Sequence, residues 1–433
     1  MKQNIFSGLR DFFILWGSQF VSSLGTAMTN FALVIWVYNQ NGTASSVTLL
    51  TICIFLPTIL FRFLAGAIAD RWDKKRIMLF ADSVAACGTV AVLALHSFST
   101  LQIWHLYTIN FLLSLMNSFQ VPASYVATSL LVPKEQYTRV SGLQSFSRSA
   151  VTILAPILGS VLLAFGGLKT VLIVDLATFA VAFVTLLVFI KIPQIPRVAE
   201  EMKESFWKSS MAGILFLKEH AVLLRIILAF AVINFLAKLG TDGIMPAFIL
   251  GKTGGDQGAL GMVEASAALG ILVGSILVTL MKPAKNKTAV IFTCCGLTFL
   301  LGGVGTGLSR SLPLWIAAQF LSYVPVALLG ANLTALMRTS VPIEMQGRVF
   351  SAMDTLQNCT IPLGLFLGGV LADHVFEPLM ASASPLQGVL TQIFGTGKGS
   401  GIAVIFFLVG IVGSAGSFLE RRNPLYRSLN EKV

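Results

Sequence analysis

Charged residues are scarce in this sequence. Only 11% of its 433 residues are Asp, Glu, Lys or Arg, whereas 55% are hydrophobic and the mean hydropathy is +0.82. In soluble proteins about a quarter of the residues are charged. A chain of this length with so few charges cannot cover a surface that faces water, which excludes a cytosolic enzyme, a disordered chain and a secreted disulfide-rich domain. The composition leaves a membrane protein that crosses the bilayer several times.

Cysteine and histidine are scarce as well. The five cysteines lie inside apolar segments without a C-x-x-C pair, and the four histidines show no spacing typical of metal ligands. Small buried side chains are the simplest interpretation of such cysteines. A nucleotide-binding loop of the type G-x-x-x-x-G-K-S/T is missing, which argues against ATP as the energy source. We therefore expect no metal site, no cofactor and no enzymatic activity.

Apolar segments recur along the whole chain. A helix needs about 20 residues to cross the hydrocarbon core of a bilayer. Twelve segments satisfy this length, at 11–37, 46–69, 77–95, 101–128, 140–165, 168–191, 221–250, 256–281, 288–308, 312–338, 347–376 and 401–419. The sequence thus predicts an all-α polytopic membrane protein with 12 transmembrane helices. We expect domains at 1–191 and 221–433, separated by a cytoplasmic stretch, 192–220, that is either a plain linker or an amphipathic helix at the membrane surface.

The basic residues are distributed unequally between the two sides of these segments. If the N-terminus faces the cytoplasm, 22 of the 30 Lys and Arg residues lie in cytoplasmic segments and only four lie in outer loops. Membrane proteins are oriented with such basic loops inside. We therefore expect both termini in the cytoplasm. The same distribution explains the net charge of +11 without a nucleic-acid partner.

Two stretches of the sequence resemble each other at a distance of 209 residues. The matching positions are Val132-Pro133, Glu135 and Arg139-Val140 with Val341-Pro342, Glu344 and Arg348-Val349. Apolar matches alone could arise by chance, whereas a loop that repeats Pro, Glu and Arg at one spacing is better explained by duplication. Two six-helix repeats that move about a site near the bilayer midplane are typical of secondary transporters.

A charged motif follows the second apolar segment. It reads Gly66-Ala67-Ile68-Ala69-Asp70-Arg71-Trp72-Asp73-Lys74-Lys75-Arg76. This resembles the major facilitator superfamily signature G-x-x-x-D-R/K-x-G-R/K-R/K, which lies between the second and third helices. The resemblance implies the 6+6 pseudo-twofold major facilitator fold. Asp73 replaces a glycine of the signature, and we expect it to keep a left-handed turn because Asp tolerates that backbone conformation.

The motif implies a gate on the cytoplasmic side. Asp70 is expected to face the positive N-terminal end of helix 347–376, near Gly347 and Arg348, and to favour the outward-open state. The basic residues expected to balance the charge at the lipid headgroups are Arg71, Lys74, Lys75 and Arg76. A basic loop that only orients the protein is the alternative, but Gly66, four residues before the acid, favours the gate.

Further stretches indicate a branch of the superfamily. DRWDKKRIMLFAD, LLVPKEQ and GRVFS are similar to the macrolide-efflux and siderophore-exporter branch of drug:proton antiporters. Segment 140–165 also resembles part of the glycine-rich antiporter motif, through Gly142, Pro156 and Gly159. Small residues there would let this helix pack closely against helix 256–281. Ordinary helix packing without a role in antiport is the alternative.

Ionisable residues within the apolar segments are costly and therefore mark functional candidates. Lys238 and Asp242 are four residues apart, on one helix face, and either take part in proton coupling or form a self-neutralised structural pair. Glu264 lies among Ala and Gly residues, an apolar setting that favours the protonated form of a carboxyl group, so we predict it as a proton carrier. Arg62 and Asp354 are expected to form a pair that breaks during the transport cycle.

The substrate cavity implied by the fold lies between its helices 1, 4, 7 and 10. The candidate polar and aromatic residues are Gln19, Asn30, Asn117, Gln120, Asn234, Gln319, Tyr323 and Asn332. The 32 Phe and 13 Met residues would supply an adaptable apolar wall. A sparse polar set in such a wall suits a bulky amphipathic solute better than a sugar.

These features together predict a transporter in the cytoplasmic membrane of a prokaryote. It would export a hydrophobic or amphipathic small molecule in exchange for protons, by alternating access, as a monomer in the lipid bilayer. An importer or flippase of a lipid, siderophore or nutrient is the nearest alternative. A membrane receptor or assembly factor that transports nothing is a more distant one. The sequence indicates no purpose for the predicted outer loop 377–400.

Overall fold

The computed structural model describes residues 10–133, 136–190, 192, 206–282, 284–342 and 345–426. Within its helices, the side chains of residues 62–71, 129, 137–139, 141, 206–212 and 347 are outside the description. Five candidate residues fall in these stretches, namely Arg62, Gly66, Asp70, Arg71 and Gly347. Every regular element in the described residues is a helix, which confirms the all-α prediction.

The part of the chain before residue 191 forms long helices. They are α1 Arg10–Asn41, α2 Ala44–Arg71, α3 Lys74–Ser97, α4 Ile103–Leu131 and α5 Tyr137–Val184, which the π-helical segment η2 Thr185–Phe189 extends. The 48 residues of α5 would measure roughly 70 Å in a straight helix, more than twice the ~30 Å of a hydrocarbon core. The helix bends at Gly167, whose φ of 65° lies in the left-handed region that favours glycine. It is therefore long enough to cross the membrane twice.

The part after residue 205 has more and shorter helices. They are α6 Phe206–Glu219, α7 Ala221–Leu239, α8 Met245–Thr253, α9 Gln257–Leu280, α10 Lys287–Thr298, α11 Thr306–Leu308, α12 Leu312–Ser340, α13 Gln346–Asn358, α14 Ile361–Leu371, α15 Glu377–Ala381, α16 Pro385–Phe394 and α17 Ser400–Arg421. Two π-helical segments, η4 Phe299–Gly305 and η6 Ala372–Phe376, and a 3-10 turn, η7 Pro424–Tyr426, complete them. Several predicted crossing segments are thus built from two or three consecutive elements.

The described helices account for most of the predicted crossings. Ten of them are long and apolar enough to span a membrane, by length and composition. The exact number of twelve is not confirmed. Segments 140–165 and 168–191 both lie in α5, on either side of the non-helical backbone at Gly167, and α4, which covers most of segment 101–128, is not among the ten. The chain is nevertheless a multi-pass membrane protein, since these helices cover most of its length.

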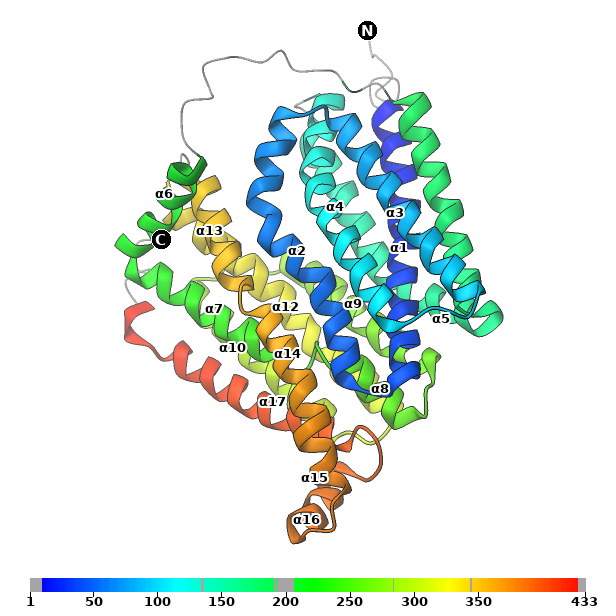
Figure 1. The fold of residues 1–433 in the computed structure, drawn as a ribbon. Coiled ribbons are helices and arrows are strands. Elements are labelled where there is room, and N and C mark those ends of the chain that lie inside the picture. Colours follow the sequence, from blue (N-terminus) through cyan, green and yellow to red (C-terminus); the bar gives the residue numbers. More distant parts are fainter. Residues whose placement is uncertain are drawn as a thin grey trace. The chain divides into compact units, whose positions relative to one another are not determined.

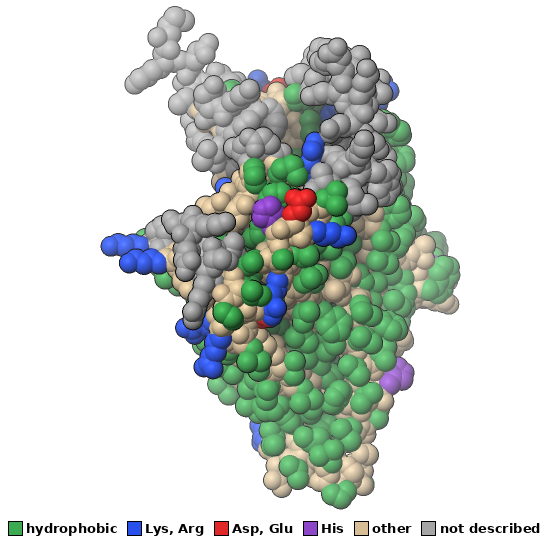
Figure 2. All heavy atoms as spheres, turned by 90° about the vertical axis from the view of Figure 1, so that its left-hand side faces the viewer, with side chains coloured by type: hydrophobic (Ala, Val, Ile, Leu, Met, Phe, Trp, Pro, Cys, Tyr) green, Lys and Arg blue, Asp and Glu red, His purple; other side chains and the backbone are tan. Residues whose placement is uncertain are grey.

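The surface fits a lipid environment. Figure 2 shows one face on which hydrophobic side chains cover the middle and lower part, while Lys and Arg side chains lie mostly in the upper half. Large apolar side chains are exposed on many long helices, among them Val232, Leu277, Leu321 and Val412. Soluble monomers rarely expose contiguous apolar areas of such extent. Lipid contact explains this surface because hydrocarbon chains solvate apolar side chains without cost.

The chain divides into two compact units. The first consists of Met1–Gln40 and Leu50–Val198, and the second of Asn41–Leu49 and Ala199–Val433. The first turn of α2 therefore groups with the second unit, although the rest of this helix groups with the first. In the first unit, α3 packs on α4 and on α5. In the second, α17 lies beside α10 and α7 (Figure 1).

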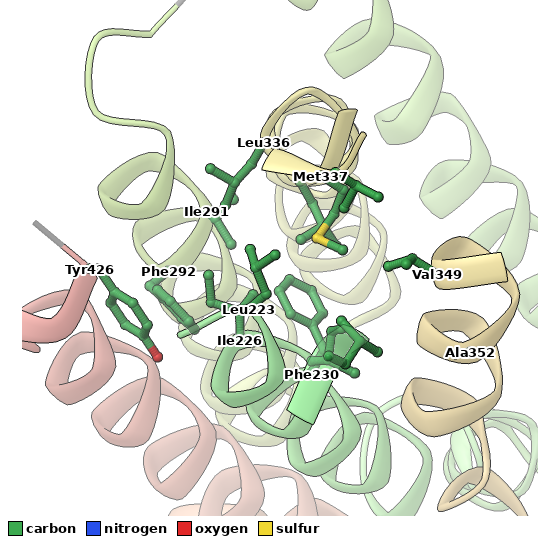
Figure 3. Close-up of a cluster of buried hydrophobic side chains, with 14 of the residues drawn as sticks. Leu223, Ile226, Phe230, Ile291, Phe292, Leu336, Met337, Val349, Ala352 and Tyr426 are labelled. Carbon is green, nitrogen blue, oxygen red and sulfur yellow. The ribbon is translucent and has the colours of Figure 1, made fainter. Parts of the chain in front are cut away.

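The second unit has an apolar core made by several helices. Figure 3 shows Leu223, Ile226 and Phe230 of α7 pointing toward side chains of α10 and α12. The Phe292 ring of α10 stacks on Tyr426 with 5.3 Å between the ring centroids and 18° between the planes. Leu217 of α6 is fully buried in the same cluster. This core fixes the cytoplasmic half of α7, as the predicted topology orients it, and thus the start of the site described below.

The predicted linker 192–220 is partly a packed element. Residues 193–205 lie outside the described part, but α6 begins at Phe206 and packs on α13. A Cβ atom on Gly213 would lie 2.7 Å from the carbonyl carbon of Arg348 and would collide with the Arg348 oxygen. The described part of this segment, α6, therefore belongs to the core of the second unit, while the remainder of the linker stays a prediction.

Candidate functional site in the second unit

The predicted crossing helix 221–250 is interrupted in its middle. α7 ends at Leu239, and a turn leads to α8, which begins at Met245. The Asp242 N–H donates a hydrogen bond to the Ala237 carbonyl at 2.9 Å. A Cβ atom on Gly243 would collide with the Lys238 carbonyl oxygen, so only glycine fits there. The continuous helix predicted from the sequence is therefore wrong at this point. Irregular backbone at membrane depth is tolerated where it is buried in protein or lines a cavity.

The interruption holds an ion pair. The Lys238 Nζ lies 3.0 Å from the Asp242 Oδ2, and the two side chains are 26% and 27% exposed. The Tyr323 hydroxyl of α12 donates to the Asp242 Oδ1 at 2.8 Å. Lys238 and Asp242 thus pair as their spacing indicates, but across the end of α7 instead of along one helix face. Both carboxylate oxygens of Asp242 are engaged by side chains from two different helices.

Glu264 of α9 belongs to the same cluster. Its half-buried carboxyl group interacts electrostatically with Asp242 and with Lys238, and the Tyr323 hydroxyl interacts with both carboxyl groups. The sequence places Glu264 alone in an apolar helix, whereas the structure brings it within electrostatic range of Lys238, Asp242 and Tyr323. With both carboxylates charged, the three ionisable groups have a net charge of −1. One added proton makes the cluster neutral.

Close packing of two helices assembles this cluster. A Cβ atom on Gly270 would lie 3.0 Å from the Tyr323 Cβ and would collide with the Phe320 carbonyl oxygen. Gly274, one turn further along α9, meets the Val324 carbonyl oxygen in the same way. A glycine every fourth residue allows membrane helices to approach with their backbones in contact. The G-x-x-x-G pattern of α9 was visible in the sequence and is the signal that would have predicted the close packing of α9 on α12.

A cavity of about 160 Å³ opens beside the interruption. Its lining residues are Phe230, Ile233, Asn234, Ala237, Thr241, Asp242, Cys295, Thr298, Phe299, Gly302, Gln319, Ser322, Tyr323, Val326 and Leu329. The wall is mainly apolar, with a few polar groups around Asp242. The structure places three of the predicted cavity residues on it, Asn234, Gln319 and Tyr323. Their part in substrate binding stays a prediction.

A π-helical segment forms one side of this cavity. Thr298, Phe299 and Gly302 lie at the start of η4 and in it, and all three line the wall. The Thr298 hydroxyl donates to the Ser322 carbonyl of α12 at 3.0 Å. π-helical turns are rare and occur frequently at functional sites, since they change the direction of side chains within a helix. The glycine-rich stretch Gly302-Gly303-Val304-Gly305 was the sequence signal for this distortion.

Other predicted cavity residues lie elsewhere. Asn332 donates to the Leu328 carbonyl of its own helix at 2.8 Å and does not line this cavity. In the first unit, Asn117 is exposed and Asn30 is half-buried. The Gln120 Nε2 donates to the Oδ1 of Asp82, a buried residue of α3, at 2.5 Å, and Gln19 lies next to the same carboxyl group. Gln19 and Gln120 therefore belong to a polar group of the first unit that joins α1, α3 and α4.

The described part of the charged motif differs from expectation in two details. Asp73 has an extended backbone, with φ of −63° and ψ of 118°, and its Oδ1 accepts from the Arg76 N–H at 2.9 Å. It therefore caps α3 and forms no left-handed turn. Lys75, expected at the lipid headgroups, donates to the Leu187 and Ile190 carbonyls at 2.9 and 2.8 Å, where a helix C-terminus attracts a positive charge.

The remaining parts of the gate are described incompletely. Lys74 and Arg348 are half-buried and Arg76 is exposed. Because Asp70 and Gly347 lie outside the described side chains, the contact between them stays a prediction. The same holds for the pairing of Arg62 with Asp354. Asp354 has a partner within α13, since the Asn358 Nδ2 donates to its Oδ1 at 3.0 Å.

The antiporter-like residues lie in the first half of α5. Pro156 is inside the helix, and a Cβ atom on Gly159 would lie 3.0 Å from the Phe31 ring and 3.6 Å from the Met28 Cα, both of α1. A Cβ atom on Gly142 would meet nothing within 4 Å. Gly159 thus serves packing on α1 within the first unit. The predicted approach of this helix to α9 stays a prediction.

Comparisons with known proteins agree with this architecture. Residues 15–293 match the model of the Major Facilitator Superfamily. Macrolide efflux protein A of Streptococcus pyogenes is 24% identical over 371 residues, which cover 84% of this chain and 90% of that protein. The enterobactin exporter EntS of Shigella flexneri is 26% identical over 332 residues, which are 74% of each chain.

Solved structures give the same result for the fold. A bacterial homologue of the human lysosomal transporter Spinster, in an inward-facing and unoccupied conformation, matches with a TM-score of 0.69 at 14% identity and covers 97% of this chain and 98% of its own. A bacterial homologue of the iron transporter ferroportin, in an inward-facing state, matches with a TM-score of 0.65 at 14% identity and covers 97% and 100%. At these identities the likeness concerns the fold alone.

Proposed function

Because the chain belongs to the major facilitator superfamily, we propose that this transporter exports a hydrophobic or amphipathic small molecule in exchange for protons. The names of two relatives, macrolide efflux protein A and the enterobactin exporter, support the direction of transport. The proposal includes alternating access by a monomer in a prokaryotic cytoplasmic membrane, with both termini inside. The positive-inside distribution of Lys and Arg supports this orientation.

One observation carries the proposal, namely that the ionisable cluster borders the cavity. Asp242 and Tyr323 line the cavity and contact each other, and Glu264 interacts with both. A substrate in the cavity therefore lies next to groups whose total charge changes by one when a proton binds. In antiport, a proton-binding group must be coupled to the substrate site, because proton and substrate must influence each other's binding.

We propose different roles for the two carboxyl groups, on the basis of their surroundings. The ammonium group of Lys238 and the hydroxyl of Tyr323 both contact Asp242, so its two carboxylate oxygens already have partners. Glu264, on the apolar helix α9, is left as the group that gains and loses a proton. A protonated Glu264 gives a neutral cluster, and its deprotonation leaves one negative charge that favours a cationic group on the substrate. Proton release and substrate binding are thereby linked.

The cavity also indicates the kind of substrate. Aromatic and aliphatic side chains, including Phe230, Phe299 and Val326, form most of its wall. Such a wall binds apolar parts of a molecule, while Asp242 and Gln319 orient a polar part. A volume of about 160 Å³ is below the roughly 300–1,000 Å³ of pockets for drug-sized ligands. The cavity of the second unit therefore holds only a part of a bulky amphipathic molecule.

Transport by purified protein in liposomes tests the proposal. With a labelled macrolide as the first probe, an imposed pH gradient should drive uptake into the liposomes, and the probe should move protons in the opposite direction. In Glu264→Gln, gradient-driven transport should fall at least about tenfold, which corresponds to ~1.4 kcal/mol of lost coupling. Exchange of labelled for unlabelled probe without a gradient should continue, because it requires no net proton movement.

Glu377→Gln is the matched control. It removes a carboxyl group from the same unit, where the Glu377 Oε1 accepts a hydrogen bond from the Ile402 N–H at the start of α17, and it should leave proton coupling unchanged. Unaltered coupling in Glu264→Gln would remove Glu264 from the mechanism. If transport by the wild type does not depend on the pH gradient for any substrate tried, antiport itself is rejected.

The nearest alternative is import or lipid flipping by the same fold. Accumulation in cells that lack their own exporters distinguishes these functions. An exporter should lower the cellular level of its substrate, and a protonophore should restore that level. An importer should raise the level, and a flippase should change only the distribution of labelled lipid between the two leaflets.

A further inference from the structure

A buried carboxyl group of the first unit takes no part in the mechanism proposed above. Asp82 of α3 is only 7% exposed. It lies eight residues after Lys74, where the helix begins, or about 12 Å along the helix axis. Its Oδ1 accepts a hydrogen bond from the Gln120 Nε2 of α4 at 2.5 Å, and Gln19 of α1 lies beside the same carboxyl group. Three helices thus enclose this acid at membrane depth.

Two atoms of this polar group have no hydrogen-bond partner. Within the part of the chain that the structure describes, neither the Asp82 Oδ2 nor the Gln19 Nε2 forms a hydrogen bond, although both atoms are buried. Asp175, a buried acid of the same unit, differs in this respect, since the hydroxyls of three threonines donate to its two oxygens. A buried polar atom without a partner is costly. The free oxygen of Asp82 therefore indicates a group that binds something further.

No charged side chain compensates Asp82 among the described residues. Its helix packs on α4, α5 and η2, and α1 contributes Gln19. The side chains that act on the carboxyl group are the amides of Gln19 and Gln120. The other described ionisable side chains of these helices do not act on it, namely Arg10, Asp11, Tyr38, Lys74, Lys75, Arg76, Cys87, His96, His105, Tyr107, Tyr125, Arg148, Lys169 and Asp175. Because a buried charge requires a partner of opposite charge, Asp82 needs a positive charge that this unit does not supply.

The surroundings favour a proton over a metal ion as this charge. The Gln120 amide presents its nitrogen to the carboxyl group, whereas hard cations take oxygen ligands and usually about six of them. One carboxyl group and two amides cannot surround such an ion. A proton needs no ligand shell, and on the Asp82 Oδ2 it would remove the uncompensated charge.

The neighbouring helix turns differ on the two sides of this polar group. On the side that the predicted topology turns to the cytoplasm, three buried apolar residues lie one turn away, namely Leu15, Met78 and Ala123. On the other side, the hydroxyl of the exposed Ser23 donates to the Gln19 carbonyl at 2.7 Å, and Asn117, one turn from Gln120, is exposed as well. An apolar layer therefore closes one side, whereas polar side chains lead from the acid to the surface of the unit.

We infer that Asp82 is a second proton-binding residue, which exchanges its proton through the side marked by Ser23 and Asn117. Together with Glu264, the transporter then has one proton-binding carboxyl group in each unit. The use of this proton in transport rests on the antiport proposed above. The proton itself is detected without substrate or pH gradient, so failure of antiport and failure of this site are distinguishable.

Infrared spectroscopy of the purified protein in liposomes tests the inference. The carbonyl stretching band of protonated carboxyl groups is recorded from acidic to alkaline pH. Asp82→Asn should remove a component of this band that the wild type loses as the pH rises. Glu264→Gln should leave this component in place. Asp11→Asn, which removes an exposed carboxyl group of the same unit, is the matched control and should leave it in place as well.

A second variant keeps the acid and changes its surroundings. Gln120→Leu removes a donor to the charged carboxylate, so the component should persist to a higher pH. The inference is overturned if Asp82→Asn loses no component, or if the component does not change with pH. A component that sodium chloride suppresses and choline chloride does not would assign the site to a metal ion and would also overturn it. If Asp82→Asn does not fold, Gln120→Leu decides, and a titration equal to that of the wild type overturns the inference.

Discussion

Two carboxyl groups inside the helical units differ in their surroundings, because one is enclosed by helices and the other lies at a cavity. Asp175 of α5 is buried and accepts hydrogen bonds from the hydroxyls of Thr26, Thr29 and Thr89, at 3.3, 3.0 and 3.3 Å. These three donors belong to α1 and α3, so Asp175 ties three helices of the first unit together. Asp242 is instead bound by one cation and one hydroxyl at a cavity. A group on a cavity wall can change its partners, whereas a group held by three hydroxyls of the enclosing helices cannot.

The pair of Lys238 and Asp242 should show a coupling free energy in a double-mutant cycle. Asp242→Asn leaves the ammonium of Lys238 without its counter-charge, and we expect it to lower the free energy of unfolding by about 1–3 kcal/mol, between the values for exposed and buried pairs. Lys238→Gln combined with Asp242→Asn should cost less than the two single changes summed. Thermal unfolding in detergent measures the cycle. Additive effects would mean that the ion pair contributes no stability.

At the scale of elements, glycines and interruptions place the site. α7 ends early and leaves Asp242 in a turn, and Gly364 and Gly368 of α14 approach the carbonyl oxygens of Phe235 and Leu239 at this end of α7. Helix packing in membranes depends on such close approach, since the hydrophobic effect does not drive helices together in lipid. The cluster of ionisable groups exists because glycines let α14 pack closely on α7 and let α9 pack closely on α12, on either side of the interruption.

Gly270→Ala should disturb both packing and the site. The added methyl group would collide with the Phe320 carbonyl and lie 3.0 Å from the Tyr323 Cβ, which we expect to cost about 1–3 kcal/mol of stability, as in other overpacked interiors. It should also weaken the hydrogen bond of Tyr323 to Asp242. Gly330→Ala, in α12 with nothing within 4 Å of its added atom, is the control. Equal melting temperatures for the two variants would contradict the role of Gly270.

Residues 377–400, which the sequence predicts as an outer loop without an assigned purpose, form a folded element. Helix α16 follows α15 at one end of the second unit (Figure 1). Arg310 donates to the Gln392 and Ile393 carbonyls, and Lys252 donates to the Phe394 carbonyl at 3.2 Å. Two cations thus bind the C-terminal end of a helix, where the helix dipole favours positive charge. Of the four Lys and Arg residues predicted to face outside, Arg310 and Lys252 bind this region, and Lys398, which is part of it, lies beside Gly42.

At the scale of the whole molecule, charge sets the orientation in the membrane. We expect a cysteine at position 398 to react with a membrane-impermeant maleimide in intact cells, and a cysteine at position 285 to react only after the membrane is permeabilised. Both positions carry exposed lysines in the native chain, and the positive-inside rule assigns them to opposite sides. Labelling followed by a gel shift measures this. The reverse labelling pattern would mean that both termini face the outside, and the gate predicted at Asp70 would then lie on the outer side of the membrane.

Much of the fold could be predicted from the sequence because the membrane imposes simple rules. Long apolar segments must be helices, since every backbone N–H and carbonyl needs a partner in lipid. Single-residue predictions were less complete, because propensity and spacing do not show where a helix is interrupted. The turn at residues 240–244 and the π-helical segment η4 arise from packing of glycines against neighbouring helices. Asp73 is likewise a helix cap, because its side chain accepts a hydrogen bond from one of the first N–H groups of α3, which have no acceptor within the helix.

The sequence by itself determined the class of protein, its helical composition and the family, since apolar length, charge distribution and the motif at Asp70 are local properties. Only the tertiary structure decided which of the interior charges lie together. Glu264 is 22 residues from Asp242 in the chain, and no periodicity relates them. The packing of α9 on α12 brings Glu264 within electrostatic range of Tyr323, whose hydroxyl donates to Asp242 from the turn after α7. The partners of Asp82 were hidden for the same reason. Hydrogen bonds between distant segments depend on how helices pack, and packing follows from the shapes of all side chains together.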